Sequence, residues 1–498
     1  MLTRLRVNGF KNLIDVDVAF GPFTCIAGVN GVGKSNLFDA ITFLSALADR
    51  PLMEAAKCVR DERNRSTDVR SLFLRIGEKH VDEMSFEAEM LVPESGHDDL
   101  GQTAKAAITF LRYALTLRYR HDQGTSAERL EITREELGYV NVSDAKKHLP
   151  FPHSAKWRNS VVRGRRFAPF LSTDAQAENR LIKFHQDGRS GKPRDYLASN
   201  LPRTVLSSAN AAESPTALLA RLEMRSWRLL QLEPSALRRA DPLHAPTHIG
   251  SDGSHLAATL HHLARAEAAD GGSPTGPLSV YAQVANRLAR LVEDVYAVRV
   301  EEDRQRELLT LQVLDRNRVP YAARALSDGT LRFLALAILE MDPEARGLLC
   351  FEEPENGIHP ERISAMLRLL KALCIDPRNP AGSDNPLRQV IVNTHSPAVV
   401  GLVDDDDLLV AEPRLVPSGE SGCRGVSFAW LNDTWRHKAF PKTRTVSRGL
   451  LGAFLNPLAY CEEDEPPMAE DGRRKPPRRR RVKDREDLQK LLPFMRRE

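Results

Sequence analysis

The sequence predicts an α/β fold built around a phosphate-binding loop, and three segments support this prediction. The apolar run 23–27 leads into the loop Gly28-Val29-Asn30-Gly31-Val32-Gly33-Lys34-Ser35, and a helix-like run follows over 36–47. Two later apolar runs, 347–351 and 390–392, end in acidic or polar residues. Buried parallel strands have this composition, and their carboxyl ends meet at one edge of a sheet.

The loop residues suit the phosphate chain of a nucleotide. Glycines at 28, 31 and 33 allow backbone N–H groups to turn towards phosphate oxygens. Lys34 can reach the β and γ phosphates, and the Ser35 hydroxyl can bind Mg²⁺. Because strand, loop and helix follow in this order, the loop predicts an ATP or GTP site. Its candidate ligands are Asn30, Gly31, Gly33, Lys34, Ser35 and Asn36, with Ser35 also on the metal.

The composition indicates a globular intracellular protein. The chain has 498 residues, of which 42% are hydrophobic, enough for about three domain-sized units. Its six cysteines, at 25, 58, 350, 374, 423 and 461, form no C-x-x-C pair and no metal-ligand spacing, so we expect reduced thiols. The chain starts without a signal-like segment, and no run of about 18 residues is apolar. We therefore expect a soluble, cytoplasmic protein without a membrane partner.

The positive charge lies near the C-terminal end. The formal net charge is +4, but residues 473–498 contain twelve Lys or Arg and four Asp or Glu, a net of +8. The rest of the chain therefore carries 4 − 8 = −4. The charge and the prolines of this basic tail predict disorder. Two roles stay open for it: contact with nucleic acid or an acidic partner, and solubilisation.

Four segments are predicted along the chain. Residues 1–135 form a β-rich lobe with an antiparallel flank, and residues 136–285 form an inserted, mainly helical subdomain without a sustained heptad pattern. Residues 286–415 form a second lobe, and residues 416–498 an extension ending in the basic tail. The expected strands are 5–10, 14–20, 86–92, 113–119, 296–300, 308–313 and 426–431, and the expected helices are 217–232, 255–268, 280–295 and 446–454.

Two acids follow the apolar run 347–351 and would stand beside the loop. Neighbouring residues of a strand face opposite ways. We therefore expect Glu352 to hold the shell of Mg²⁺ and Glu353 to orient or deprotonate an attacking water, which are the roles that phosphoryl transfer to water requires. Paired acids at strand ends are common on surfaces, but the five uncharged residues before this pair favour burial.

Two further candidates lie in the second lobe. His395 follows the strand 390–392 and could contact the γ phosphate or the water. Alone it would be interpreted as structural, but its place after the loop and the acid pair favours a catalytic role. Ser327 fits the N-cap of a helix expected to end near Met341, and with Gly329 it would present N–H groups to an anion.

Together these motifs resemble the ATPase heads of the RecF/SMC-like AAA family. Leu326-Ser327-Asp328-Gly329 resembles the ABC signature, residues 352–360 resemble the Walker B motif and D-loop, and Asn393-Thr394-His395-Ser396 resembles the switch histidine. Phe10-Lys11-Asn12 resembles a loop near the phosphates, which adds Lys11 and Asn12 to the candidate ligands. The resemblance covers about residues 1–135 and 286–412 and implies an α/β fold of the ABC-type P-loop ATPase head.

The resemblance also implies an enzyme that hydrolyses ATP between two heads. Ser327 and Gly329 of one chain would complete the ATP site of another chain. Bound ATP would then hold the chains together in a homodimer or a higher oligomer. Catalysis would fall to Glu353 and His395, and Mg²⁺ to Ser35 and Glu352. The chain departs from the family pattern in having Glu at 352, Asp at 328 and no glutamine identified as the Q-loop. An Asp at 328 would bring negative charge near the γ phosphate.

Three functions fit this class to different degrees. The compact form resembles the ATPase subunits of bacterial antiviral systems, in which head engagement controls a separate effector, such as a nuclease or toxin. The alternative is a RecF-like DNA-repair ATPase that clamps duplex DNA through the insertion and the basic tail. A transporter's nucleotide-binding subunit fits poorly, because the segment 136–285 is too long for the usual connection between lobes.

Two weaker patterns can each be interpreted either as a solvent-exposed segment without a function of its own or as a functional site. Trp157, Arg163, Arg165 and Arg166 could touch nucleic acid, although a solvated loop is favoured. Asp404-Asp405-Asp406-Asp407 could suggest a Toprim-like metal centre, although consecutive acids point in different directions and repel, so a solvated turn is favoured.

Overall fold

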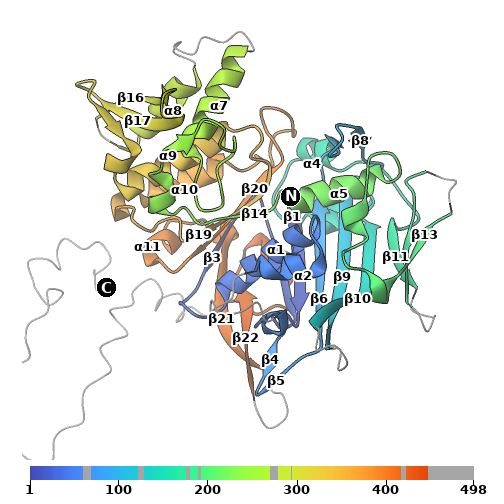
Figure 1. Cartoon of the computed structure of the whole chain (residues 1–498). Helices are drawn as coiled ribbons and strands as arrows, with labels where there is room; N and C mark the ends of the chain where they lie inside the picture. The colour runs from blue at the N-terminus through green and yellow to red at the C-terminus, as the bar shows by residue number, and fades with distance from the viewer. Residues whose placement is uncertain are drawn as a thin grey trace, which may run out of the picture. The chain divides into compact units, whose positions relative to one another are not determined.

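Two large β-sheets organise the computed structural model (Figure 1), which describes residues 1–59, 69–121, 128–174, 180–188, 192–269, 279–292, 294–416 and 422–446. The expected helix at 446–454 and the basic tail lie outside the described residues, apart from Val446 itself. Among the helices that the structure describes, none is long and apolar enough to cross a membrane.

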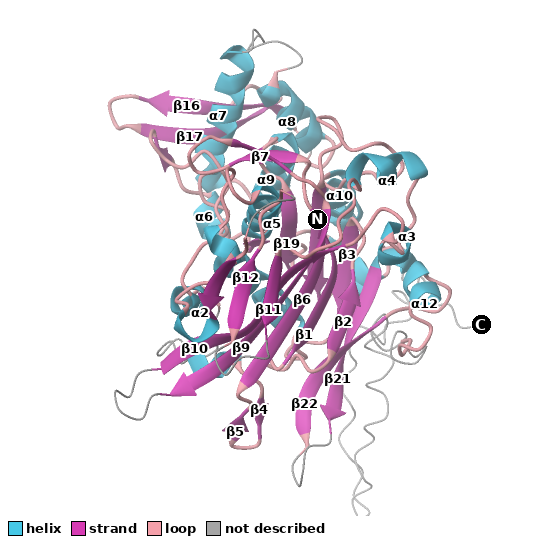
Figure 2. Ribbon diagram, turned by 90° about the vertical axis from the view of Figure 1, so that its right-hand side faces the viewer, coloured by secondary structure: helices cyan, strands magenta, loops and turns pink. Residues whose placement is uncertain are grey.

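The first sheet is antiparallel and confirms the β-rich start of the chain. Its described strands are β1 Leu2–Asn8, β2 Val16–Ala19, β6 Glu83–Leu91, β9 Phe110–His121, β10 Glu128–Tyr139, β11 Leu171–Asp174, β12 Leu181–Phe184 and β13 Arg194–Leu197. They lie in the order β13-β12-β11-β10-β9-β6-β1-β2, and most of them run side by side in Figure 2. The four alternating runs predicted in the first lobe correspond to β1, β2, β6 and β9, with shifted ends.

The second sheet contains the three buried strands that the sequence predicts before the loop, the acid pair and His395. Its strands are β14 Arg228–Leu230, β19 Gly347–Glu352, β20 Arg388–Thr394, β3 Phe23–Ala27, β21 Leu408–Val416 and β22 Cys423–Ala429, in that spatial order. Neighbouring strands are parallel, except for the antiparallel pair β21 and β22. The register pairs Ala27 with Thr394 and Glu352 with Asn393. The phosphate-binding loop and both predicted catalytic segments therefore leave the sheet at one edge.

Helices cover both faces of this parallel sheet, which explains why its strands read as continuous apolar runs. The helices concerned are α1 Lys34–Leu47, α9 Asp328–Met341 and α10 Ile363–Ala372. Ile26, Cys350 and Ile391 belong to a core shared with α1 and the antiparallel sheet. Their neighbours Cys25 and Leu349 belong to a second core with α9 and α10, and in Figure 1 the two groups of helices lie on opposite sides of β19 and β20.

Smaller elements surround these layers. A further sheet contains β15 Asp241–Pro242, β17 Leu308–Asp315, β16 Val295–Asp303 and β18 Pro320–Ala322, and it packs with α7 Leu256–Ala269 and α8 Val280–Ala289. The other described elements are the hairpins β4 Arg75–Ile76 with β5 Lys79–His80 and β7 Ser95–His97 with β8 Thr103–Lys105, and the helices α2 Leu52–Lys57, α3 Ala145–His148, α4 Ala155–Val161, α5 Pro215–Arg225, α6 Pro234–Leu237, α11 Pro397–Val400 and α12 Trp435–Ala439.

The segment 136–285 contains strands that the sequence analysis missed. β11, β12 and β13 extend the antiparallel sheet, and β14 joins the parallel sheet beside β19. These strands have only three or four residues each, too few to show an alternating pattern. The helix expected at 217–232 ends at Arg225, and the helix expected at 280–295 ends at Ala289. The domain boundaries at 135, 285 and 415 stay predictions.

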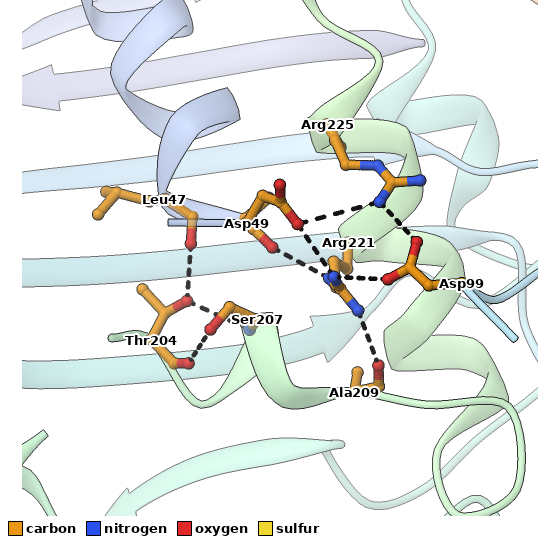
Figure 3. A network of polar contacts seen from close by, with 9 residues as sticks. Leu47, Asp49, Asp99, Thr204, Ser207, Ala209, Arg221 and Arg225 are labelled. Carbon is orange, nitrogen blue, oxygen red and sulfur yellow. Dashed lines mark hydrogen bonds and ion pairs between the residues drawn. The ribbon is translucent and has the colours of Figure 1, made fainter. Parts of the chain in front are cut away.

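The helix after the phosphate-binding loop is anchored at its far end. Thr204 Oγ1 donates to the carbonyl of Leu47, at 3.0 Å, which satisfies one of the carbonyls that a helix end leaves open. Arg221, on α5, pairs with Asp49 at 3.0 Å and with Asp99 at 3.2 Å (Figure 3). These bonds tie the far end of α1 to Thr204 and Arg221 of the segment 136–285.

A buried arginine joins the two sheets. The guanidinium of Arg436, on α12, donates to the Ala19 carbonyl at 3.0 Å, to the Thr24 hydroxyl at 3.1 Å and to the Asp406 carbonyl at 2.5 Å. Ala19 belongs to the antiparallel sheet and Thr24 to the parallel sheet. Arg436 is fully buried, so its loss would leave these acceptors without this donor and without water.

We expect Arg436→Ala to lower the free energy of unfolding by about 3 kcal/mol, because it removes the three hydrogen bonds of a fully buried side chain and opens a cavity. Urea unfolding followed by circular dichroism measures this loss as a lower midpoint. Lys438→Ala is the matched control, since Lys438 is exposed on the same helix. Equal midpoints for the two variants would show that Arg436 does not hold the sheets together.

Candidate nucleotide-binding site

A cavity of about 970 Å³ lies at the carboxyl edge of the parallel sheet. Ten predicted site residues line it: Lys11, Asn12, Asn30, Gly31, Gly33, Lys34, Ser35, Asn36, Glu352 and Glu353. The cavity is lined by residues from the start of the chain, by residues 231–233 and by residues between 332 and 424. His395, Ser327 and Gly329 are not among its lining residues.

The loop is shaped by a glycine and braced by Asn12. Gly33 has φ of 110°, a left-handed conformation that favours glycine, and a Cβ there would collide with the Asn12 side chain. Asn12 Nδ2 donates to the Val32 carbonyl at 3.0 Å, and its Oδ1 accepts from Asn36 Nδ2 at 2.8 Å. Asn12 and Asn36 therefore hold the loop from outside, and both face the cavity.

Lys34 lies buried within its own loop. Its Nζ donates to the carbonyls of Gly28, at 2.6 Å, and Val29, at 3.0 Å. Burial lowers the pKa of Lys34, and nearby carboxylates of the second lobe, foremost Glu353, counteract this shift. A phosphate that enters the cavity would replace the two carbonyls as partner of this ammonium group.

Lys11 reaches the site by an unusual backbone turn. Its φ is 48°, in the left-handed region, and its Nζ pairs with Asp39 of α1 at 2.7 Å. Asp39 is buried, so this ion pair links the loop after β1 to the helix that follows the phosphate-binding loop. Lys11 therefore lines the cavity with a neutralised side chain.

Glu352 has the surroundings of a cation ligand. Its carboxylate accepts a hydrogen bond from Gln231 Nε2, and Asn393 Nδ2 donates to Oε1 at 3.3 Å. Ser35 and Gln231 line the same cavity, so hydroxyl, amide and carboxylate oxygens are available together. Such oxygen ligands suit Mg²⁺, which keeps further positions for water and phosphate oxygens. Among the described residues, no group of three or more His, Cys, Asp or Glu side chains could hold a metal ion.

Glu353 faces the same cavity as Glu352, which corrects the expected alternation. The strand β19 ends at Glu352, and Glu353 has φ of 44°. This strained left-handed conformation is held by the Glu353 N–H, which lies 3.1 Å from both the carbonyl and the Oδ1 of Asn393. The side chain then accepts from Asn356 Nδ2 at 2.9 Å and lies 2.7 Å from His395 Nδ1.

His395 therefore reaches the site through Glu353. The histidine lies just past β20, and its ring orients the carboxylate oxygen Oε1 of Glu353. Behind this pair, Thr394 Oγ1 donates to Glu355 Oε1. The other carboxylate oxygen, the buried Oε2 of Glu355, has no hydrogen-bond partner among the described residues. Burial raises the pKa of Glu355. All three acids of the segment 352–355 lie near enough to Lys34 to counteract the lowering of its pKa by burial.

The sequence analysis missed several polar residues of the cavity, and two of them, Gln231 and Arg332, have notable surroundings. Gln231 follows β14 directly and donates to Glu352, and the sequence analysis did not single it out. Arg332, on α9, is 9% exposed, and its Nε has no hydrogen-bond partner in the described part of the chain. Burial lowers the pKa of Arg332, and its guanidinium offers unused donors to a phosphate.

Ser327 and Gly329 lie at the start of α9. The Ser327 hydroxyl accepts from the Thr330 N–H at 3.2 Å, which confirms the predicted N-cap. A Cβ on Gly329 would lie 3.1 Å from the Gly357 carbonyl, so the turn packs against the segment that follows the acid pair. Neither residue lines the chain's own cavity.

Three residues of the basic and aromatic cluster, Trp157, Arg163 and Arg166, make contacts within the protein. Trp157 is fully buried and packs against Phe151 with ring centroids 5.5 Å apart. Arg166 lies over the Phe170 ring at 3.8 Å, and Arg163 pairs with Glu94 at 2.5 Å. This leaves no aromatic side chain of the cluster available to stack on a base.

The four aspartates at 404–407 stabilise a turn. Lys371 pairs with Asp404 at 2.5 Å and with Asp407 at 2.8 Å, and Asp406 Oδ1 accepts from the Trp435 N–H at 3.0 Å. The acids thus point to different partners, and no metal-binding group is found among the described residues. The structure favours the turn over the Toprim-like centre.

The chain belongs to an AAA family. The model of the family described as "AAA domain, putative AbiEii toxin, Type IV TA system" matches residues 23–401, which include the phosphate-binding loop, the acid pair and His395. This match confirms the predicted relationship to AAA-family ATPases. None of the curated proteins is similar to the chain at the level required for a match.

Solved structures of SMC heads are among the similar folds. An Smc head bound to the C-winged helix domain of ScpA is 14% identical, with 86% of this chain and 98% of that chain covered and a TM-score of 0.44. The SMC head domain from Thermotoga maritima is 12% identical, covers 85% and 97%, and has a TM-score of 0.34. An Smc head from Pyrococcus furiosus with an extended coiled coil, bound to the C-terminal domain of ScpA, is 13% identical, covers 86% and 96%, and has a TM-score of 0.41.

Proposed function

We propose that the chain binds ATP with Mg²⁺ and hydrolyses it to ADP and phosphate. The observation that carries this proposal is the hydrogen-bonded pair of Glu353 and His395 beside the phosphate-binding cavity. A carboxylate oriented in this way can take a proton from water, while Lys34 and the loop N–H groups bind the phosphates. Mg²⁺, held by Ser35 and Glu352, would neutralise phosphate charge. Release of phosphate from ATP by the purified chain, dependent on Mg²⁺, tests the proposal.

The site is completed by a second copy of the chain in this proposal. Support comes from Ser327 and Gly329, which lie at a helix N-terminus outside their own cavity. Helix N-termini attract anions through free N–H groups and the helix dipole. Two copies arranged head to head would each place this turn on the ATP of the other, and ATP would join the dimer.

Ser327→Arg tests this arrangement. The long cationic side chain would fill the space for the partner's phosphate, so we expect ATP turnover to fall at least about tenfold, while ATP binding to a single chain persists. Ser95→Arg, an exposed serine of the β7–β8 hairpin, is the matched control. Unchanged turnover in Ser327→Arg would contradict the two-chain site.

ATP-driven closure controls a separate effector protein in the cytoplasm in our proposal. The family description names a putative toxin and a toxin–antitoxin system, and a system of that kind pairs a toxin with a second protein, which supports the existence of a partner. Affinity purification from the native cell should then yield a second protein, such as a nuclease or toxin. Direct DNA binding by the isolated chain that weakens steeply with salt would favour the DNA-clamp alternative instead.

A further inference from the structure

One segment, residues 228–239, touches both halves of the proposed site. It contains β14, Gln231 and α6. Gln231 donates to Glu352 in the chain's own cavity. Arg238, at the end of α6, donates from Nη2 to Asp328 Oδ1 at 2.5 Å and to the Leu326 carbonyl at 3.1 Å.

The segment is held as one unit. The Gln231 N–H donates to the Ser251 carbonyl at 2.7 Å, and the Glu233 N–H donates to the Asp252 carbonyl at 2.8 Å. Leu232 and Leu237 are buried in the core that also contains α9. Gln231 and Arg238 therefore belong to one packed segment that contacts both Glu352 and the turn at Ser327.

Arg238 contacts the residues on both sides of Ser327. On the opposite side of the turn, a Cβ on Gly357 would lie 3.2 Å from the Asp328 Cβ. The turn is thus confined between Arg238 and the segment that follows the acid pair. The side chains of Arg238 and Asp328 stay 31% and 44% exposed, so a phosphate from outside can approach them.

The charge of Asp328 explains the need for this arginine. A carboxylate next to Ser327 would repel the triphosphate that the signature turn must receive from a second copy. The Arg238 guanidinium cancels that charge, and its other N–H groups can donate to phosphate oxygens. We propose that Arg238 is a positioning residue that neutralises Asp328 and orients Ser327, so that the turn accepts the γ phosphate of ATP bound to a second copy. The inference rests on the two-chain site proposed above.

The test measures ATP-dependent dimerisation in chains that also carry Glu353→Gln, which should keep ATP bound. Analytical ultracentrifugation gives the dimer dissociation constant with ATP and Mg²⁺. We expect Arg238→Ala to raise this constant at least about tenfold, because the carboxylate of Asp328 then loses its ion-pair partner and faces phosphate. Arg239→Ala should leave it unchanged, since Arg239 is the exposed neighbour. Adding Asp328→Gly to Arg238→Ala should restore dimerisation, and ATP binding to single chains should be equal throughout.

Each result decides the inference. A parent Glu353→Gln chain that stays monomeric with ATP would overturn the two-chain site and this inference with it. A parent that dimerises, together with an Arg238→Ala variant of equal dissociation constant, would overturn the role of Arg238 alone. A weak Arg238→Ala variant that Asp328→Gly fails to restore would also overturn it, because the loss would then come from disturbed structure rather than from charge.

Discussion

Replacing Lys34 with alanine is expected to weaken ATP binding by about 3 kcal/mol, which is more than a hundredfold in Kd. The substitution removes the only lysine that the phosphate-binding loop itself contains. Lys34 is 6% exposed, so its ammonium group is held within the loop rather than in solvent. Its present partners are two loop carbonyls, which a phosphate can displace without breaking an ion pair. Fluorescence titration with a labelled ATP analogue measures the loss, and hydrolysis should disappear with it.

The control for this substitution is Lys57→Ala, which removes an exposed lysine at the end of α2. Both variants should melt near the wild-type temperature, because neither removes apolar packing. An Lys34→Ala chain that folds and binds ATP as tightly as Lys57→Ala would show that the loop is not the phosphate site.

Glu353→Gln is expected to slow hydrolysis by two to three orders of magnitude while ATP stays bound, in line with the usual contribution of about 10²–10⁴ from a general base. Glutamine has the same shape and can keep contacts with Asn356 and His395, but it cannot take a proton from water. Single-turnover measurements separate hydrolysis from binding. The expected pattern is an ATP affinity near wild type with little phosphate release.

Glu344→Gln provides the matched control, because Glu344 lies exposed in the connection before β19. Its turnover should equal that of the wild type. If Glu353→Gln also hydrolyses ATP at that rate, Glu353 is not the base, and the acid that remains buried nearby, Glu355, becomes the candidate.

The part of the site closest to regular structure could be predicted from sequence. The loop 28–35, the strand ending at Glu352 and the N-cap Ser327 each have a local signal, namely glycine spacing, an uncharged run and a capping side chain. Parallel strands then bring their carboxyl ends together without further information. This explains why ten predicted residues line one cavity.

The contacts between distant segments could not be predicted in this way. Gln231 sits in an apolar stretch that continued the preceding helix pattern, and its partner Glu352 is 121 residues away. The pair Arg238 and Asp328 is separated by 90 residues. The left-handed backbone of Glu353 has no local signal either, because it depends on hydrogen bonds to Asn393 of the neighbouring strand. Such features arise from tertiary packing.

The central claim is that ATP joins two copies of this chain. Light scattering of the Glu353→Gln chain measures this claim most directly, with ATP and Mg²⁺ and with ADP. The same measurement is made on a chain that carries both Glu353→Gln and Ser327→Arg. The account predicts twice the monomer mass with ATP, the monomer mass with ADP, and the monomer mass with ATP once Ser327→Arg is present. A chain that stays monomeric with bound ATP, or a doubled mass that Ser327→Arg leaves intact, would contradict it.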